Sequence, residues 1–184
     1  ILYAGRIGLG ISESFFDIAE AIKNLIAKGL KIKLYIQATN SSPLLTELAK
    51  HDFVQLNKAV PYNELPRIFA ESDLLIMPND FDNKSISFLR FSMPTKASEY
   101  MASGTPILVY SSKETAVTLH ALKYNWAYVV SEKNITKLEN AISEIYKHKD
   151  LRIKLGSTAE EFSISHYDSC LVRDQFRKSF ILTQ

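Results

Sequence analysis

The sequence predicts an α/β protein built on a doubly wound parallel sheet, and two observations carry this prediction. Short apolar runs of strand length alternate with segments of helical period along residues 1–148. Several of the short runs are nearly continuous in apolar residues, as in parallel strands that helices cover on both faces. Because such alternation produces right-handed crossovers onto one open sheet, we expect about six parallel strands with helices on both faces.

Six short segments are the strand candidates, because each is apolar and is bounded by turn residues or by a helical pattern. They are Ile1–Ala4, Ile32–Ile36, Phe53–Gln55, Leu74–Met77, Ile107–Tyr110 and Ala127–Val130. In a doubly wound sheet, ligands bind outside the carboxyl ends of the strands, where the strand order reverses. A site is therefore expected among the loops that follow these strands.

Helical segments separate the strands, and several carry terminal signals. The first helix has its apolar residues, from Phe15 to Ile26, on one face. Ser12 or Ser14 is expected to cap its first turn, and Gly29 is expected to follow its last turn. The other predicted helices begin at the Ser42-Pro43 signal, span Asn63–Glu71, Pro94–Ser103 and Lys113–Lys123, and follow the Asn134 cap; Leu151–Phe180 is expected to form two helices with a break near Ser165-His166.

Composition limits the function classes. The chain has 184 residues, which fits one domain, and its 22 Lys and Arg against 20 Asp and Glu give a net charge of +2. That charge is too small for a protein that binds a nucleic-acid backbone. The single cysteine, Cys170, excludes an internal disulfide, favours a reducing compartment and is expected to be a small packing residue. No apolar run approaches the roughly 20 residues that span a bilayer.

Three further features bear on the interpretation. Ile1 begins a strand-like run with no initiator Met, so we interpret the chain as a piece of a longer polypeptide. The four histidines show no ligand-like spacing, and Trp126 is expected to lie in the core. The stretch Pro78–Met93 holds Asp80 and Asp82 but lacks the glycine and closing glutamate of a calcium loop. Because it is long for a compact domain, we expect a mobile lip over the site.

A glycine-rich loop follows the first strand. In Gly5-Arg6-Ile7-Gly8-Leu9-Gly10, the glycines allow a close approach of the backbone to a ligand, and Arg6 offers a bidentate fork to a phosphate. The spacing matches neither the dinucleotide fingerprint nor the P-loop. Taken alone, the loop favours a glycine-rich turn with a solvated arginine.

The segment Phe91–Pro106 is the most informative in the chain. Pro94 suits the first position of a helix that ends at Gly104. Lys96 and Glu99 stand three positions apart, which places both on one face of this helix. The alternative to a functional pair is an exposed ion pair that contributes only a few tenths of a kcal/mol.

The run Pro94–Pro106 (PTKASEYMASGTP) resembles the C-terminal domain of GT-B-fold glycosyltransferases, most closely the retaining class with bacterial capsule and lipopolysaccharide enzymes. Four other stretches follow that family's order: Ile1–Arg6, Lys33–Ile36, Val60–Leu65 and Ser72–Pro78. The resemblance covers the chain up to Lys147. It implies a Rossmann-like, nucleotide-sugar-binding core over residues 1–148 and a helical tail over residues 149–184, within one domain, with an N-terminal acceptor domain outside this chain.

The resemblance also implies residue roles. Arg6 matches the basic residue that neutralises the diphosphate as the glycosidic bond breaks, and Lys96 adds positive charge, so these two are the predicted catalytic residues. Glu99 matches the acid that binds the ribose hydroxyls, and the backbone of Val60 meets the base. The backbone N–H groups of Thr95 and Lys96 are expected to hold the diphosphate. The predicted nucleotide-sugar site comprises Gly5, Arg6, Val60, Pro94, Thr95, Lys96 and Glu99.

Two departures from the family pattern stand out. The family often has a second acid eight positions before the one that Glu99 matches, and Phe91 occupies that position. The acid that contacts the donor sugar is therefore missing or supplied from elsewhere. Many members also carry a lysine soon after the arginine of the first loop, whereas none follows Arg6 here. We expect Lys96 to compensate for that charge.

The sequence therefore favours the donor half of a glycosyltransferase that moves a sugar from a nucleotide diphosphate-sugar to a bacterial surface glycan. The reaction is expected to need no metal or cofactor. The chain alone is expected to bind nucleotide weakly and to transfer nothing, because its acceptor domain is absent. The alternative is a non-catalytic nucleotide-sugar-binding or scaffold module with a degenerate site. We expect a cytoplasmic location with peripheral membrane contact open, and a dimer through Leu171, Val172, Phe176 and Phe180 of the tail.

Overall fold

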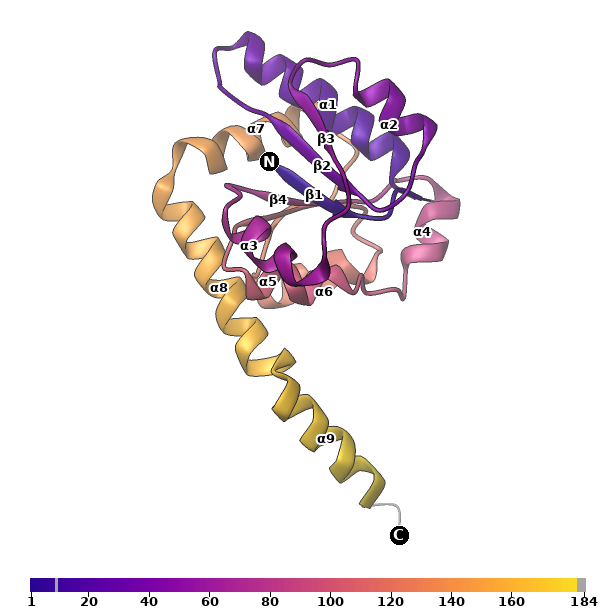
Figure 1. Cartoon of the computed structure of the whole chain (residues 1–184), viewed down its shortest axis with the longest axis vertical. Coiled ribbons are helices and arrows are strands. Elements are labelled where there is room, and N and C mark those ends of the chain that lie inside the picture. Colours follow the sequence, from indigo (N-terminus) through magenta and orange to yellow (C-terminus); the bar gives the residue numbers. More distant parts are fainter. Residues whose placement is uncertain (9, 182–184) are drawn as a thin grey trace.

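The six strands form one sheet in which every neighbouring pair is parallel, in the order β3-β2-β1-β4-β5-β6. Figure 1 shows this computed structural model, which describes residues 1–8 and 10–181. The strands are β1 (Leu2–Gly5), β2 (Leu34–Ala38), β3 (Val54–Asn57), β4 (Leu75–Pro78), β5 (Ile107–Tyr110) and β6 (Tyr128–Val130). The prediction of about six parallel strands is confirmed.

Helices cover both faces of the sheet (Figure 1). They are α1 (Ser12–Ala27), α2 (Pro43–Leu48), α3 (Leu65–Ala70), α4 (Asn83–Leu89), α5 (Lys96–Ala102), α6 (Ala116–Tyr124), α7 (Ile135–Lys147), α8 (Lys149–Tyr167) and α9 (Ser169–Ile181), with a 3-10 turn η1 (Tyr62–Glu64) before α3. The strand side chains on one face of the sheet pack with α1, α2 and α7 in one core cluster. Those on the other face pack with α3, α5, α6 and α8 in a second cluster. Because successive side chains of a strand point to opposite faces, both faces are apolar and both are covered by helices, as in a doubly wound sheet.

Several terminal signals act as predicted. The side chain of Ser42 accepts the N–H of Leu44 and that of Asn134 accepts the N–H of Lys137, so both residues cap their helices. Gly29 has a φ of +93° directly after α1. Trp126 is fully buried and donates its indole N–H to Nδ1 of His120 at 2.8 Å, as a core position requires.

The cap predicted for α1 is wrong. Ile11 occupies the cap position, and neither Ser12 nor Ser14 caps the helix with its side chain. Instead the carboxylate of Asp80 accepts the N–H of Ser14 at 2.7 Å. A residue that is distant in sequence therefore supplies the oxygen that a local serine was expected to give.

The stretch Pro78–Met93, expected to be a mobile lip, borders the site but contains helix α4 rather than a continuous loop. Asp82 caps this helix by accepting the N–H groups of Lys84 and Ser85, and Asp80 is buried with only 5% of its surface exposed. Both acids therefore have structural partners. The sequence does contain a short signal for α4, namely an aspartate at the cap position followed by apolar residues within a single helical turn.

Other boundaries differ by a few residues. Ile32 belongs to the core but precedes β2, which begins at Leu34. Helix α5 begins at Lys96, so Pro94 lies before the cap residue, and its carbonyl accepts the N–H of Ala97. Helix α6 begins after Thr115, because the N–H of that residue bonds to Ser112 in a preceding turn.

The tail consists of α8 and α9, and α9 extends away from the sheet (Figure 1). The break predicted near Ser165-His166 lies at Asp168, whose side chain accepts the N–H groups of Cys170 and Leu171. Cys170 is exposed, so its predicted packing role is wrong, because α9 has no core to pack against. No helix within residues 1–8 and 10–181 is long and apolar enough to cross a membrane.

Candidate functional site

The strand order reverses between β1 and β4, which flank each other at the centre of the sheet. Two adjoining cavities open at the carboxyl ends of these strands. The Glu99 cavity, of about 400 Å³, is lined by all seven residues of the predicted site: Gly5, Arg6, Val60, Pro94, Thr95, Lys96 and Glu99. The Phe88 cavity, of about 450 Å³, is lined by residues that include Met77, Phe88 and Leu89. Both cavities share Arg6, Pro94 and Lys96, so this pair of cavities is the position at which a doubly wound sheet binds ligands.

Lys96 lies at the partition between the two cavities. Its ammonium nitrogen is 3.9 Å from the centroid of the Tyr3 ring. Burial lowers the pKa of Lys96 to about 7, and the nearby charge of Glu99 acts in the opposite direction. A lysine in this environment gains its full charge when an anion binds beside it.

Gly5 is required at the end of β1 for two reasons. Its φ is +143°, a conformation that favours glycine. A β-carbon at this position would also lie 2.6 Å from the Lys96 ammonium nitrogen. The absence of a side chain at Gly5 therefore lets Lys96 reach across the end of β1.

The glycine-rich loop after β1 is held by one side chain of β1 and by one from the loop after β2. The hydroxyl of Tyr3 donates to the carbonyl oxygen of Arg6 at 2.8 Å. The amide side chain of Asn40 accepts the N–H of Ile7 and donates to its carbonyl, both at 2.8 Å. Arg6 itself is exposed and borders both cavities. The loop is therefore fixed while its guanidinium stays accessible; Leu9 lies outside the described residues.

Helix α5 is anchored to β1 through Tyr100. Its buried hydroxyl accepts the N–H of Ala4 at 2.8 Å and donates to the Ala4 carbonyl at 3.2 Å. Burial raises the pKa of this hydroxyl well above its usual range. The start of α5, with Thr95 and Lys96, is thereby held at the end of β1.

Glu99 faces the loop that follows β3. Its Oε1 accepts a hydrogen bond of 2.8 Å from the hydroxyl of Tyr62, which raises the pKa of that hydroxyl. The side chain of Gln37 donates to the carbonyl of Lys58 and ties the start of the same loop to β2. Within the described residues, Glu99 forms no ion pair with Lys96, so the exposed-pair alternative does not hold.

Sequence reasoning missed four residues that shape the site. Tyr3, Gln37 and Asn40 hold the loops, and Tyr62 holds Glu99. Only Tyr62 carried a local signal, since it stands in the Val60–Leu65 turn that marks the site's edge. Gln37 and Asn40 act through partners 21 and 33 positions away, which no local pattern reveals. The contact of Tyr3 with Arg6 is only three positions long, but it depends on the turn that follows β1.

The position eight before Glu99 contributes nothing to either cavity. Phe91 is 89% exposed and lines neither the Glu99 cavity nor the Phe88 cavity. No group of three or more His, Cys, Asp or Glu that suits a metal ion occurs in the described part of the chain. The charged side chains of the site are thus Arg6, Lys96 and Glu99.

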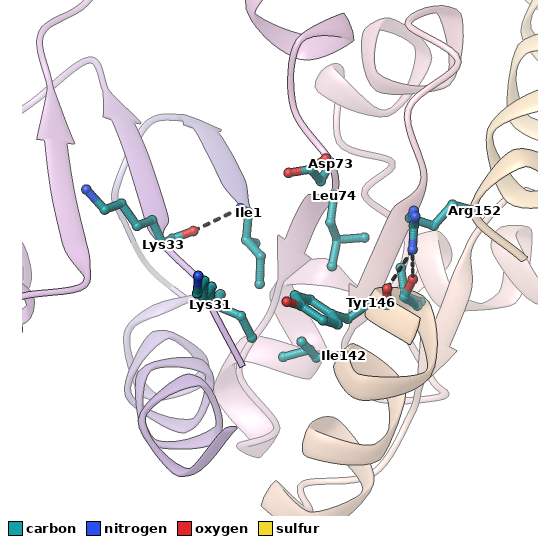
Figure 2. A pocket seen from close by; sticks show the side chains of 10 residues that line it. Ile1, Lys31, Lys33, Asp73, Leu74, Ile142, Tyr146 and Arg152 are labelled. Carbon is teal, nitrogen blue, oxygen red and sulfur yellow. Dashed lines mark hydrogen bonds between the residues drawn. The ribbon is translucent and has the colours of Figure 1, made fainter. Parts of the chain in front are cut away.

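A third cavity, of about 390 Å³, lies at the other ends of the strands, next to the amino ends of β1 and β4 (Figure 2). Here the amino group of Ile1 donates to the carbonyl of Lys33 at 2.9 Å. Arg152 donates to the carbonyls of Ile145 and Tyr146, both at 2.7 Å, and so closes the end of α7. None of the seven predicted site residues lines this amino-end cavity.

Comparison with known proteins gives a family match. Residues 1–148 match the family described as glycosyl transferases group 1. No curated protein matches the chain in sequence.

Solved structures share the fold. The chain is similar to the α,α-trehalose 6-phosphate synthase from Burkholderia multivorans, with a TM-score of 0.74 and 16% identity over 99% of this chain and 42% of that one. It is similar to the C-terminal domain of a glycosyl transferase group 1 family protein (LpcC) from Francisella tularensis, with a TM-score of 0.68 and 15% identity over 91% and 85%. It is also similar to Anabaena Alr3699/HepE in complex with UDP-glucose, with a TM-score of 0.71 and 11% identity over 97% and 48%. The chain thus spans less than half the length of the synthase and of HepE.

Proposed function

Because the chain belongs to the glycosyl transferases group 1 family, we propose that it is the donor-binding domain of an enzyme that transfers a sugar from a nucleotide diphosphate-sugar. The observation that carries the proposal is the Glu99 cavity at the switch point of the sheet, with two cations and one carboxylate on its wall. A nucleotide diphosphate-sugar needs cations for its diphosphate and an acceptor for its ribose hydroxyls. The relative in complex with UDP-glucose shows that this fold takes such a ligand elsewhere.

The diphosphate binds at the border of the two cavities in this proposal. Arg6 and Lys96 both stand there, and Arg6 gives a fork that matches two phosphate oxygens. The backbone N–H groups of Thr95 and Lys96, at the start of α5, add donors. When the glycosidic bond breaks, negative charge grows on the leaving diphosphate, and the two cations stabilise it.

The nucleoside then occupies the Glu99 cavity. Glu99 accepts hydrogen bonds from the ribose hydroxyls, since its second oxygen is open, and the backbone of Val60 meets the base. The sugar extends into the Phe88 cavity on the other side of Lys96. In this proposal, charge stabilisation comes from Arg6 and Lys96, and the reaction needs no metal or cofactor.

The acceptor lies outside this chain in the proposal. We propose one domain with a core over residues 1–148 and a tail over residues 149–184, an acceptor domain upstream, a bacterial surface glycan as acceptor, and retention at the anomeric carbon. The apolar side chains of α9, with Phe176 63% exposed, support a dimer through the tail. A cytoplasmic location with peripheral membrane contact completes the proposal.

Turnover of the protein with its upstream half restored tests this function. UDP- and GDP-sugars are offered with a glycan acceptor, and Arg6→Ala is the test variant. The matched control is Arg67→Ala, because Arg67 of α3 pairs on the surface with Glu71, the residue that ends this helix, and lines neither cavity. Sugar transfer that Arg6→Ala abolishes supports the proposal. Transfer that Arg6→Ala leaves unchanged would contradict it.

A second candidate is a non-catalytic nucleotide-sugar-binding module, and the exposed Phe91 in place of an acid favours it. The same experiment separates the two functions. Binding of the nucleotide-sugar without turnover in the restored protein supports the binding module.

A further inference from the structure

One hydrogen bond joins the turn η1 to α5 beside the Glu99 cavity, whose lining includes Glu99 but not Tyr62. Tyr62, in η1, donates its hydroxyl to Oε1 of Glu99 on α5, with an oxygen–oxygen distance of 2.8 Å. The Tyr62 ring is 71% exposed, so its packing contributes little to the fold. The hydroxyl is therefore the chemically important part of this side chain.

Glu99 has an oppositely charged neighbour on its own helix. Lys96 precedes it by three positions on α5, a spacing at which opposite charges meet on a helix surface. Among the described residues, however, the Lys96 ammonium forms no ion pair, and it lies 3.9 Å from the centroid of the Tyr3 ring. The carboxylate and the ammonium are thus directed to different aromatic residues.

We propose that Tyr62 is a positioning residue that keeps Glu99 and Lys96 apart, so that the carboxylate stays available for a ribose and the ammonium for a diphosphate. The purpose of this separation rests on the proposed function. The separation itself is a property of the free chain and is tested without nucleotide.

The chemistry of the three groups supports this role. A carboxylate has two acceptor oxygens, and Tyr62 uses one position on Oε1, which leaves Oε2 open. Because a phenol is neutral, it orients Glu99 without cancelling its charge. An ion pair with Lys96 would instead reduce the charge that each group presents to a ligand.

The pKa of Lys96 depends on how close the Glu99 carboxylate lies, so it measures the separation of these two groups. Burial lowers the pKa of Lys96 to about 7, and Glu99 is the charge that raises it. The ammonium also lies against the ring of Tyr3 on β1, and Arg6 lines the same cavity. Without the Tyr62 hydroxyl, Glu99 turns toward Lys96, and the pKa of Lys96 rises.

The experiment compares Tyr62→Phe with Tyr128→Phe in the whole chain. Tyr128, on β6 and away from the site, also donates its hydroxyl to a glutamate, Oε2 of Glu144, at 2.7 Å. The control therefore removes the same hydroxyl oxygen from a similar tyrosine–glutamate hydrogen bond. Acylation of Lys96 with an amine-selective reagent, quantified by mass spectrometry across pH, gives its titration midpoint. Calorimetry with uridine diphosphate at pH 6 gives the affinity.

We expect Tyr62→Phe to raise the Lys96 midpoint by about one pH unit, the smaller end of the effect of a new opposite charge nearby. We also expect it to weaken uridine diphosphate binding several-fold, while Tyr128→Phe changes neither. An unchanged midpoint in Tyr62→Phe would overturn the inference, even if affinity falls, because Tyr62 would then act on the nucleotide directly. A raised midpoint in a chain that binds no nucleotide would support the separation and contradict the proposed function.

Discussion

The ammonium nitrogen of Lys96 lies 3.9 Å from the centroid of the Tyr3 ring, at the end of β1. This contact places a lysine at the switch point of the sheet against a ring that carries no formal charge, so the ring does not compete with an anion for the ammonium. Gly5 makes the contact sterically feasible, because any side chain at that position would meet Lys96. The arrangement leaves the lysine ready for an anionic ligand.

Nucleotide binding is expected to weaken as the pH rises above 7. The free chain holds Lys96 with a pKa of about 7, and a bound diphosphate raises that pKa because it favours the ammonium. Binding therefore takes up a proton above pH 7, and affinity falls as pH rises toward the pKa of the bound state. Calorimetry at pH 8 in buffers of different ionisation enthalpy measures this uptake. Lys96→Ala is expected to abolish it and to weaken binding several-fold; equal uptake in both proteins would refute the role of Lys96.

Gly5→Ala is expected to damage both stability and binding. The φ of +143° strains any residue with a β-carbon, at a cost of about 1–3 kcal/mol in the free energy of unfolding. The new methyl group also displaces the Lys96 ammonium, so nucleotide affinity falls as well. Urea unfolding and calorimetry measure the two effects. Gly29→Ala is the control, because Gly29 also has a positive φ, of +93°, but a methyl group there would meet no heavy atom beyond its chain neighbours within 4 Å. This control should lose stability and keep its nucleotide affinity; a Gly5→Ala protein that also keeps its affinity would contradict the assignment.

Gly156→Ala is expected to destabilise the junction between α8 and α5. A methyl group on Gly156 would overlap the carbonyl oxygen of Gly104, which is backbone and cannot rotate away. Overpacking of this kind costs about 1–3 kcal/mol, and the better helix propensity of alanine offsets only part of it. Urea unfolding measures the change. Ser157→Ala, exposed on the same helix, should stay within about 0.5 kcal/mol of the parent; equal stability of the two variants would show that α8 shifts freely.

The tail is expected to promote self-association. Residues 168–180 are exposed throughout, and Phe176 and Phe180 contact each other with ring centroids 4.8 Å apart. An isolated helix of this length is marginal in water, so burial of its apolar face is favourable. Gel filtration at increasing concentration should show a dimer that Phe176→Ser removes. Leu119→Ser, at a comparably exposed position on α6, should leave the dimer intact; a parent that stays monomeric would contradict this expectation.

The sheet was predictable from the sequence because its periodicity is local. Strand β5 matches its predicted bounds, and the Ser42 and Asn134 caps act within their own helices. The predictions that failed are those that depend on contacts between residues distant in the sequence. At the start of α1, the N–H of Ser14 bonds to Asp80, 66 positions away, instead of to a nearby serine side chain. No residue near the helix start indicates this partner.

The site shows the same division. The family resemblance of Pro94–Pro106 and of the other matching stretches led to seven residues that line one cavity, although their roles stay predictions. The i, i+3 spacing of Lys96 and Glu99 left an exposed ion pair as the alternative to a functional pair, whereas the structure directs the two side chains to Tyr3 and Tyr62. Helix α4 was missed because a seven-residue segment carries too little periodicity to distinguish a helix from a loop.

The most direct test of the central claim is an amide NMR titration of the chain with uridine and guanosine diphosphate. If the Glu99 cavity holds the nucleotide, then one of the two ligands should shift the amide signals of Gly5, Val60, Lys96 and Glu99 in a saturable way. The signals of Tyr146 and Arg152, which line the amino-end cavity, should stay in place. Shifts confined to the amino-end cavity, or none at either edge of the sheet with both nucleotides, would contradict the account.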